Sequence, residues 1–440
     1  MSRVLDPTTV AELAARLAAA QPGRDPRAAE VEQRRQPAHV VYGGADRFRA
    51  DTARRLGAAA LAALDAHAAT PLALAAAFGV ADEKLAAAVH SRVRAKLERE
   101  PVEDFRLDFE DGYGYRPDDE EDRHADAAAR AAAQGLAAGT LPPFLGLRTK
   151  PLSPEWAPRA LATLDRFVST LVSASGGLLP GGFVVTLPKV AAPVEVATLA
   201  AALDELEAGL GLDVGSIGVE LMVETPRAIF TADGRLALPE LVEAAAGRCV
   251  GAHFGTYDYT AALGISAGHQ RMGHPACDFA KHAMQVALAG SGVYLSDGAT
   301  NVLPLGDDRH AVHAAWRRHA ADVRHSLAGG FYQGWDLHPA QLVSRWTALY
   351  VFFLEGLDEA SARLRNFVEQ AARATRVGEV FDDAATGQGL INHFLRAIQC
   401  GALDAAEAER RTGLSAGELA TRSFTAVLAA RLDRDRASPR

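Results

Sequence analysis

Short apolar runs alternate with longer helical stretches along most of this chain. The runs have the length and composition of buried β-strands, and several end in glycine, proline or a charged residue. The stretches between them, such as residues 158–174 and 196–210, carry apolar residues at the i, i+3, i+4 spacing of an amphipathic helix. Eight strands are predicted, at residues 38–44, 105–111, 144–151, 183–190, 217–225, 249–259, 292–298 and 331–339.

The alternation of strand and helix predicts the fold class. Strands separated by helices pair in parallel through right-handed crossovers, and eight of them close into an α/β TIM (β/α)8 barrel. A doubly wound open sheet is the alternative. Its glycine-rich phosphate turn, GxGxxG after the first strand, is absent here.

Flanking segments add helical parts to the predicted barrel. Residues 1–36 read as an N-terminal helical extension packed outside the main domain. Residues 37–345 form the barrel, with an alanine-rich helical insertion after the first strand at about 55–100. Residues 346–440 form a C-terminal helical region.

Polar side chains gather where the predicted strands end. In a TIM barrel the C-terminal ends of all strands share one rim, and catalytic side chains come from that rim and its loops. We therefore expect these residues to lie at one mouth of the barrel: Glu110, Asp111, Arg148, Lys150, Lys189, Glu224, Asp258, Asp297, Asp336 and His338.

Two of these acids suggest a metal site. Glu224 and Asp258 end two neighbouring strands. Magnesium prefers one or two protein carboxylates and leaves its other positions for water and substrate. A buried carboxylate without a partner is also costly, on the order of several kcal/mol or more, so a cation beside it has a physical reason.

Structural roles compete with functional ones for the other polar residues. Lys189 follows a proline and fits a solvated loop charge equally well, His338 fits a structural histidine, and Asp297 before a glycine fits a turn. The charged residues deeper in the strands favour a buried ion network inside the barrel: Arg106, Asp108 and Glu220.

Composition narrows the class of partner. The formal net charge is −9 and no basic stripe stands out, which argues against nucleic-acid binding. Three cysteines without a CxxC pair predict neither a disulfide framework nor a structural zinc site and favour the cytoplasm. The longest apolar run, 346–354, is far shorter than the roughly 20 residues that cross a bilayer. The N-terminus lacks the apolar core of a signal peptide.

Seven motifs in order carry a family resemblance. The sequence resembles the superfamily of citrate lyase β-subunits, malyl-CoA lyases and 2-keto-acid aldolases, whose members are pyruvate/phosphoenolpyruvate-type TIM barrels. The motifs are LDFED at 107–111, LRTK at 147–150, LPK at 187–189, VETPRAI at 223–229, FGTYDYTAALG at 254–264, SDGATNV at 296–302 and WDLHPAQ at 335–341.

The resemblance implies roles for the acids and for one arginine. Glu224 and Asp258 would ligate Mg²⁺, with Mn²⁺ as an alternative. Glu110 and Asp111 would hold metal-bound waters or orient the site, and Arg148 would contact the enolate oxygen of the substrate.

Further residues complete the predicted site. Lys189 and Asp297 are catalytic candidates. The backbone N–H groups of Thr256, Tyr257 and Asp258 could hold a substrate carboxylate, with Gly255 allowing close approach. With Arg148, the predicted substrate contacts are Lys150, Gly255, Thr256, Tyr257 and His338.

These expectations predict a Mg²⁺-dependent carbon–carbon lyase or aldolase that acts through the enolate of pyruvate, oxaloacetate or a related 2-keto acid. An acyl-CoA partner stays open, because Lys150 replaces the asparagine of the family's R-V-N motif. A homo-oligomer, a trimer or hexamer, is implied. The alternatives are phosphoryl or phosphonate chemistry on phosphoenolpyruvate, with Lys150 or Lys189 binding phosphate, and a non-catalytic regulatory or assembly barrel.

Overall fold

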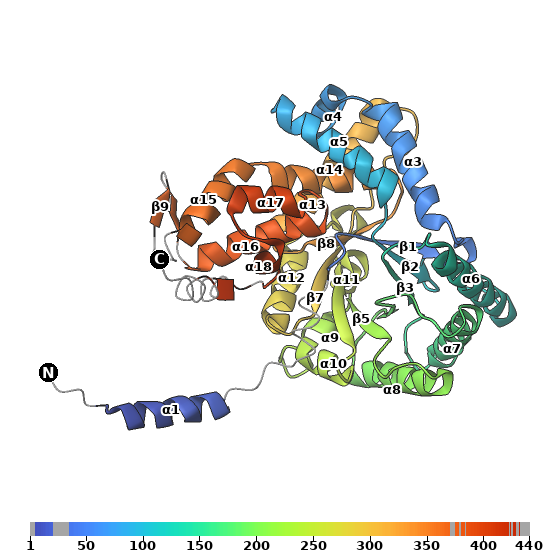
Figure 1. Ribbon diagram of the computed structural model, residues 1–440. Helices are drawn as coiled ribbons and strands as arrows, with labels where there is room; N and C mark the ends of the chain where they lie inside the picture. The colour runs from blue at the N-terminus through green and yellow to red at the C-terminus, as the bar shows by residue number, and fades with distance from the viewer. Residues whose placement is uncertain are drawn as a thin grey trace.

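The computed structural model describes residues 5–20, 35–369, 375–377, 380–382, 384–421, 423, 426–427 and 431. Eight parallel strands close into a barrel in chain order, with β1 pairing both β2 and β8 (Figure 1). The predicted TIM barrel is therefore confirmed. The strands are β1 (Val40–Gly44), β2 (Asp104–Asp108), β3 (Phe144–Arg148), β4 (Val184–Leu187), β5 (Gly218–Val223), β6 (Cys249–Phe254), β7 (Tyr294–Ala299) and β8 (Gln333–Asp336).

Helices surround the barrel and begin and end at local signals. The Asp82 side chain accepts from two backbone N–H groups at the start of α5, and Gly139, in the left-handed region, ends α6. The helices between β1 and the end of the barrel are α3 (Thr52–His67), α4 (Pro71–Phe78), α5 (Glu83–Arg99), α6 (Asp118–Ala138), α7 (Ala157–Ala174), α8 (Pro193–Leu210), α9 (Pro226–Ile229), α10 (Leu238–Ala244), α11 (Thr256–Ala262), α12 (Pro275–Leu288), α13 (Arg309–Ala328) and α14 (Gln341–Leu354).

Six of the eight strands end earlier than the sequence predicts, whereas β1 ends at Gly44 as predicted and β7 ends one residue later, at Ala299. β2 ends at Asp108 and β5 at Val223, so Glu110 and Glu224 lie in the loops that follow. The sixth strand was predicted to continue to residue 259, but it ends at Phe254, and α11 takes over from Thr256. Asp258 therefore lies in the first turn of a short helix.

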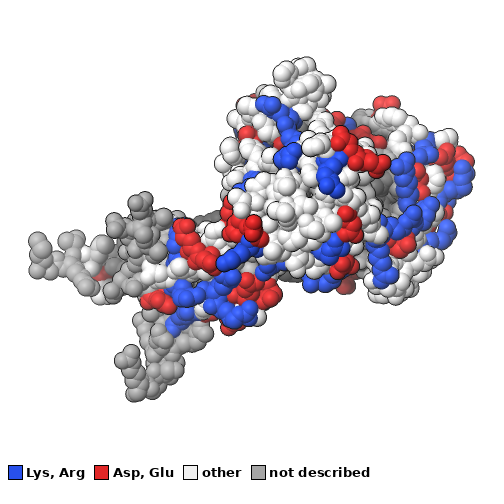
Figure 2. Space-filling model, turned by 90° about the horizontal axis from the view of Figure 1, so that it is seen from above, with Lys and Arg blue, Asp and Glu red and all other residues white. Residues whose placement is uncertain are grey.

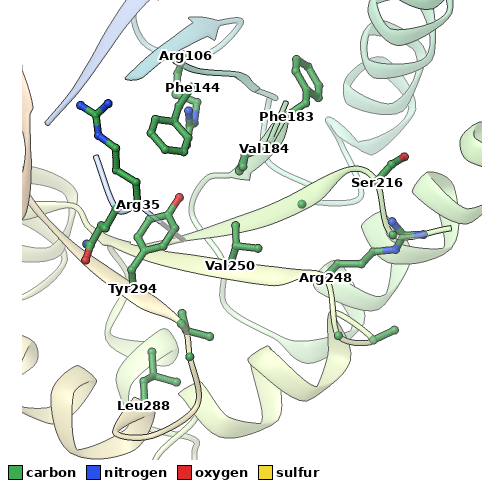
Figure 3. A pocket seen from close by; sticks show the side chains of 18 of the residues that line it. Arg35, Arg106, Phe144, Phe183, Val184, Ser216, Arg248, Val250, Leu288 and Tyr294 are labelled. Carbon is green, nitrogen blue, oxygen red and sulfur yellow. The ribbon is translucent and has the colours of Figure 1, made fainter. Parts of the chain in front are cut away.

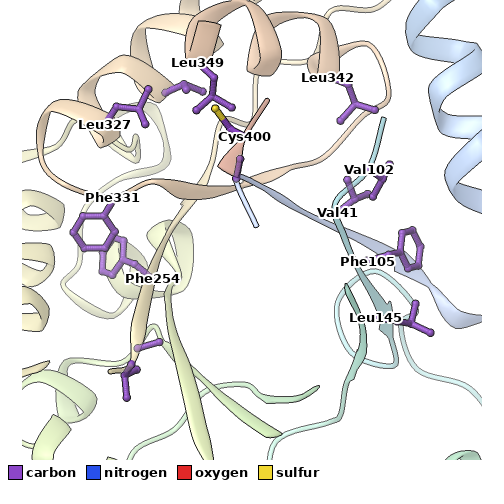
Figure 4. Packing of buried hydrophobic residues seen from close by; sticks show 14 of the residues in the cluster. Val41, Val102, Phe105, Leu145, Phe254, Leu327, Phe331, Leu342, Leu349 and Cys400 are labelled. Carbon is purple, nitrogen blue, oxygen red and sulfur yellow. The ribbon is translucent and has the colours of Figure 1, made fainter. Parts of the chain in front are cut away.

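The core has an apolar outer shell and a polar interior. Apolar side chains pack between the barrel and its helices, as Figure 4 shows for Val41, Phe105 and Leu145. Inside the barrel, Arg106 donates to Asp104 and lies 3.6 Å from Glu220. Such barrels are commonly filled by branched aliphatic residues, whereas this interior holds the predicted ion network.

Helices in an insertion after β1 and in the C-terminal region extend the barrel. The insertion after β1 is helical, as predicted, and α3 and α5 pack against α14. The C-terminal region contains α15 (Leu357–Glu369), α16 (Ala384–Gln399), α17 (Ala405–Thr412) and α18 (Ala416–Ala420). It also holds an unpredicted antiparallel pair, β9 (Thr375–Val377) and β10 (Val380–Asp382).

The N-terminal helix α1 (Pro7–Ala20) forms as predicted but is exposed. Val10, Leu13 and Leu17 on this helix are each about half exposed. Among the described residues no single helix has the length and composition to cross a membrane, and α3 and α4, bent by 90°, pass that test only together.

The surface charges and the cysteines are both as the sequence predicts, with mixed charges and no disulfide among the described residues. On the face seen in Figure 2, acidic and basic side chains lie interspersed, without a continuous basic band. Cys249, Cys277 and Cys400 are free and buried.

Candidate functional site

Arg148 lies at the end of β3 and is almost wholly buried. Its Nε donates to Oδ1 of Asp108 at 2.8 Å and its Nη2 to Oδ2 at 2.6 Å, a two-point pairing that fixes the guanidinium plane. The guanidinium also faces the rings of Tyr42 and Trp335, 5.0 and 5.4 Å from their centroids. Burial alone would raise the pKa of Asp108, but Arg148 holds that pKa below its ordinary value. The guanidinium of Arg148 is therefore a positive charge held in one orientation by Asp108.

Glu110 links Arg148 to Lys189 at the mouth of the barrel. Its Oε2 lies 2.9 Å from Nη1 of Arg148, and its Oε1 accepts from the Lys189 ammonium at 2.5 Å. Oε2 is buried and has no hydrogen bond of good geometry. Burial raises the pKa of Glu110, and the neighbouring Asp111 raises it further. Glu110 is thus a carboxyl group that binds a proton more readily than an exposed glutamate does, although Arg148 and Lys189 oppose the shift of its pKa.

Lys189 connects three loops of the rim. Its ammonium lies 3.4 Å from Asp111 and 3.6 Å from Asp258. Its backbone N–H donates to Oε1 of Glu224 at 2.7 Å. The φ of Lys189 is 54°, a left-handed conformation that costs a residue other than glycine free energy and is found mainly at functional sites.

Glu224 is the most perturbed acid of the site. It is 2% exposed and follows β5 directly. Burial raises its pKa to about 8, and the negative charges of Glu110 and Asp258 add to the shift against the opposing charge of Lys189. A Cβ on Gly255 would lie 2.5 Å from both Cβ and Oε2 of Glu224, so glycine is required at 255. Gly255 was predicted to allow the close approach of a substrate carboxylate, and in the structure the group that approaches it is the Glu224 side chain.

The charges of this cluster fit a divalent cation. Five carboxylates gather around two cations: Asp108, Glu110, Asp111, Glu224 and Asp258 around Arg148 and Lys189. Burial raises the pKa of Glu224 more than the charges of Lys189 and Arg148 lower it, so a further cation would stabilise its ionised form. In the described part of the chain, no three His, Cys, Asp or Glu residues are grouped as metal ligands. A Mg²⁺ ion held by the pair Glu224 and Asp258 would keep positions for water and substrate.

The start of α11 supplies polar groups beside the acids. Thr256 is buried and its Oγ1 has no hydrogen-bond partner. The Tyr257 hydroxyl donates to the carbonyl of Ala299 at 2.9 Å and accepts from the N–H of Asn301 at 3.0 Å. Tyr257 therefore braces the loop after β7, and the predicted backbone contacts at 256–258 lie in a first helical turn, where N–H groups have no intrahelical partner.

Three predicted site residues lie elsewhere. Lys150 points toward α6, where its ammonium binds Glu121 at 2.6 Å and the carbonyl of Phe109 at 3.0 Å. Buried Asp297 binds Lys281 at 3.0 Å. The His338 ring accepts from the N–H of Ala340 in its own turn. The structure places none of the three in the cluster, because Lys150 and Asp297 form ion pairs with α6 and α12, and His338 binds within its own turn.

Sequence reasoning missed the residues that hold Arg148. The sequence predicted Asp108 as part of the ion network of the barrel interior, although the predicted strand, which extended to residue 111, puts Asp108 and Glu110 on one face. Tyr42 and Trp335 resemble core aromatics, and nothing in their local sequence indicates that their rings flank a guanidinium.

Comparison of the sequence with known families identifies the family of this chain. A profile of the family described as domain of unknown function DUF6986 matches residues 10–427. The chain belongs to this family. No curated protein sequence matches it.

A search of solved structures finds matches to this DUF6986 protein. It is similar to a citrate lyase from Burkholderia xenovorans LB400, with a TM-score of 0.56 and 18% identity over 88% of this chain and 96% of that one. It also matches the malate synthase of Haloferax volcanii, with a TM-score of 0.47 and 16% identity over 88% of this chain and 97% of that one. The citrate lyase likeness confirms the barrel fold that the sequence resemblance implied.

Proposed function

We propose that this DUF6986 protein is a Mg²⁺-dependent carbon–carbon lyase or aldolase that acts on a 2-keto acid. The observation that carries the proposal is the buried Glu224 carboxyl group, whose pKa is raised by burial. It accepts from the backbone N–H of Lys189, whose ammonium lies 3.6 Å from Asp258 and contacts Glu110. Glu110 in turn contacts Arg148. The likeness to a citrate lyase supports the same class of reaction.

The chemistry follows from charge placement. Mg²⁺ at Glu224 and Asp258 would polarise the keto oxygen of the substrate and stabilise the enolate charge. Arg148 adds a preorganised positive charge beside that oxygen, because Asp108 fixes its plane before the substrate arrives. The Lys189 ammonium, about one third exposed, is the cation that a substrate carboxylate reaches from solvent.

Glu110 is the proposed proton carrier. In the cleavage of a 2-keto-4-hydroxy acid, the base takes the proton of the 4-hydroxyl, the C3–C4 bond breaks, and an aldehyde leaves. The electron pair of that bond forms the enolate, which a proton at C3 then converts to pyruvate. The raised pKa of Glu110 suits both uptake and return of the proton.

The phosphoenolpyruvate alternative loses one of its two predicted phosphate ligands, since Lys150 is paired with Glu121 away from the cluster. An acyl-CoA partner and a homo-oligomer stay predictions from the family resemblance.

Enolate formation can be tested without knowing the acceptor. Pyruvate is incubated in D₂O with the protein and Mg²⁺, and loss of the methyl signal is followed by ¹H NMR. We expect catalysed exchange that EDTA and the substitution Glu224→Gln abolish. The matched control is Glu98→Gln, the same chemical change at an exposed position on α5, and it should exchange like the unaltered protein.

Absence of exchange with both pyruvate and oxaloacetate, or exchange that EDTA leaves unchanged, would contradict the proposal. Release of phosphate from phosphoenolpyruvate would instead support the phosphoryl alternative. Cleavage of 2-keto-4-hydroxy acids and of malyl-CoA, compared in the same buffer, then shows whether an acyl-CoA partner is used.

A further inference from the structure

A pocket opens at the end of the barrel opposite the candidate metal site. Its volume is about 610 Å³, and the starts of five successive strands line it, at Phe144, Val184, Gly218, Val250 and Tyr294 (Figure 3). Glu224 lies six residues beyond Gly218, directly after the end of the same strand. At about 3.3 Å per residue the pocket is roughly 20 Å from the candidate metal site, so it is a separate site.

Two glycines make room for the polar groups at its base. A Cβ on Gly251 would come within 2.6 Å of the Tyr294 ring, so glycine lets that ring lie across β6. A Cβ on Gly146 would lie 3.1 Å from Cδ of Arg106 and 2.1 Å from the carbonyl of Val184. Larger residues at either position would push Tyr294 or Arg106 out of its place in the pocket wall.

Three hydrogen-bond donors in this wall lack a partner. Arg106 is 1% exposed, and its Nη2 makes no hydrogen bond, with the nearest acid, Glu220, at 3.6 Å. Nε of Arg35 is also buried and unpaired. Among the described residues, the Tyr294 hydroxyl makes no hydrogen bond. Figure 3 shows Arg35, Arg106 and Tyr294 on the same side of the pocket. The two buried donors, on Arg35 and Arg106, each cost roughly 1–3 kcal/mol when unpaired, which an acceptor on a ligand would relieve.

Charge and shape define the ligand class. The residues that line the pocket include four arginines, Arg35, Arg106, Arg248 and Arg396, and one acid, Asp204. The acids that pair with Arg35 and Arg106 stand behind them and do not line the pocket. They are Glu100, Glu103, Asp104 and Glu220. Phe144, Phe183, Val184 and Val250 add apolar walls.

We propose that this pocket binds a small organic carboxylate with an apolar body. The carboxylate accepts from Arg106 and Tyr294, and the apolar body packs against Phe144 and Val250. Arg35 precedes β1 and Arg396 lies on α16, so the segment before the barrel and the C-terminal helical region both border the pocket. An occupant therefore contacts the barrel and the C-terminal region together, which is the arrangement of an effector site. The inference does not depend on the proposed reaction.

Calorimetric titration of the full chain with phenylacetate tests the proposal. Phenylacetamide, a neutral molecule of the same shape, and inorganic phosphate, an anion without an apolar body, are titrated in parallel. We expect saturable binding of phenylacetate and at least tenfold weaker binding of the other two. Val250→Trp should abolish binding by filling the pocket, and Tyr294→Phe, which keeps the ring, should weaken it severalfold.

Glu224→Gln, at the far mouth, should bind phenylacetate with unchanged affinity, because its side chain is not in this pocket. Circular dichroism and thermal unfolding establish that each variant folds. The proposal is overturned if phenylacetate does not saturate the protein below about 20 mM, which corresponds to a very weak complex. It is also overturned if phenylacetamide binds with equal affinity. Unchanged binding of phenylacetate by both pocket variants, or loss of its binding in Glu224→Gln, would overturn it as well.

Discussion

The backbone N–H of Lys189 lies 2.7 Å from Oε1 of Glu224 and is a donor to that buried carboxyl group. The unusual backbone of Lys189, with φ at 54°, belongs to the same turn and also directs its ammonium toward Glu110. One residue thus supplies a neutral donor to one acid and a positive charge to another. The candidate site depends on this turn for the relative positions of its carboxylates.

Gly255→Ala should disrupt the site with little effect on the rest of the barrel. The added Cβ would lie 2.5 Å from Cβ and Oε2 of Glu224, so the carboxyl must move. Overpacking of this kind costs typically about 1–3 kcal/mol. We expect a loss of pyruvate exchange of tenfold or more together with a folded far-UV spectrum. Gly268→Ala, where an added Cβ meets nothing, is the control and should keep full activity.

The raised pKa of Glu224 predicts a pH-dependent stability of the metal-free protein. The folded pKa is about 8 and the ordinary value is 4.5, so the folded state binds the extra proton between these limits. The stabilisation is complete below pH 4.5 and is lost as pH rises through 8. Denaturant unfolding in EDTA should show a fall of roughly 3–5 kcal/mol from pH 5 to pH 9 relative to Glu224→Gln. A parallel pH dependence in both proteins would show that Glu224 titrates normally.

Lys150 should matter for stability rather than for chemistry. Its ammonium forms a buried ion pair with Glu121, and removing one partner of such a pair costs about 3–5 kcal/mol. Lys150→Met should therefore lower the free energy of unfolding by an amount of that order. The KM for the substrate should not change. A large rise in KM without a loss of stability would return Lys150 to the substrate site.

The barrel was predictable because burial imposes short apolar strands between amphipathic helices, and eight such units allow few topologies. Glu224, Asp258, Arg148, Glu110, Asp111 and Lys189 were predictable as neighbours for the same reason, since strand ends share a rim. The side-chain directions of Lys150 and Asp297 were not. Each binds a residue distant in sequence, Glu121 or Lys281, and no local pattern reveals such a partner.

The change from strand to helix at Gly255 also escaped prediction. The sequence from 254 to 259 is as rich in aromatic residues as a strand, and the helix begins directly after Gly255, which lies against Glu224. The periodicity of these residues does not reveal this contact with a segment about thirty residues away, and Asp258 therefore lies on a helical turn where a strand was predicted.

Mg²⁺ binding by Glu224 and Asp258 is the central claim, and calorimetric titration of MgCl₂ into the metal-free protein with pyruvate present tests it most directly. We expect one ion per chain, binding at least tenfold weaker in Glu224→Gln and Asp258→Asn, and unchanged binding in Glu98→Gln. Saturable binding that both acid variants retain, or no binding by the unaltered protein, would contradict the account.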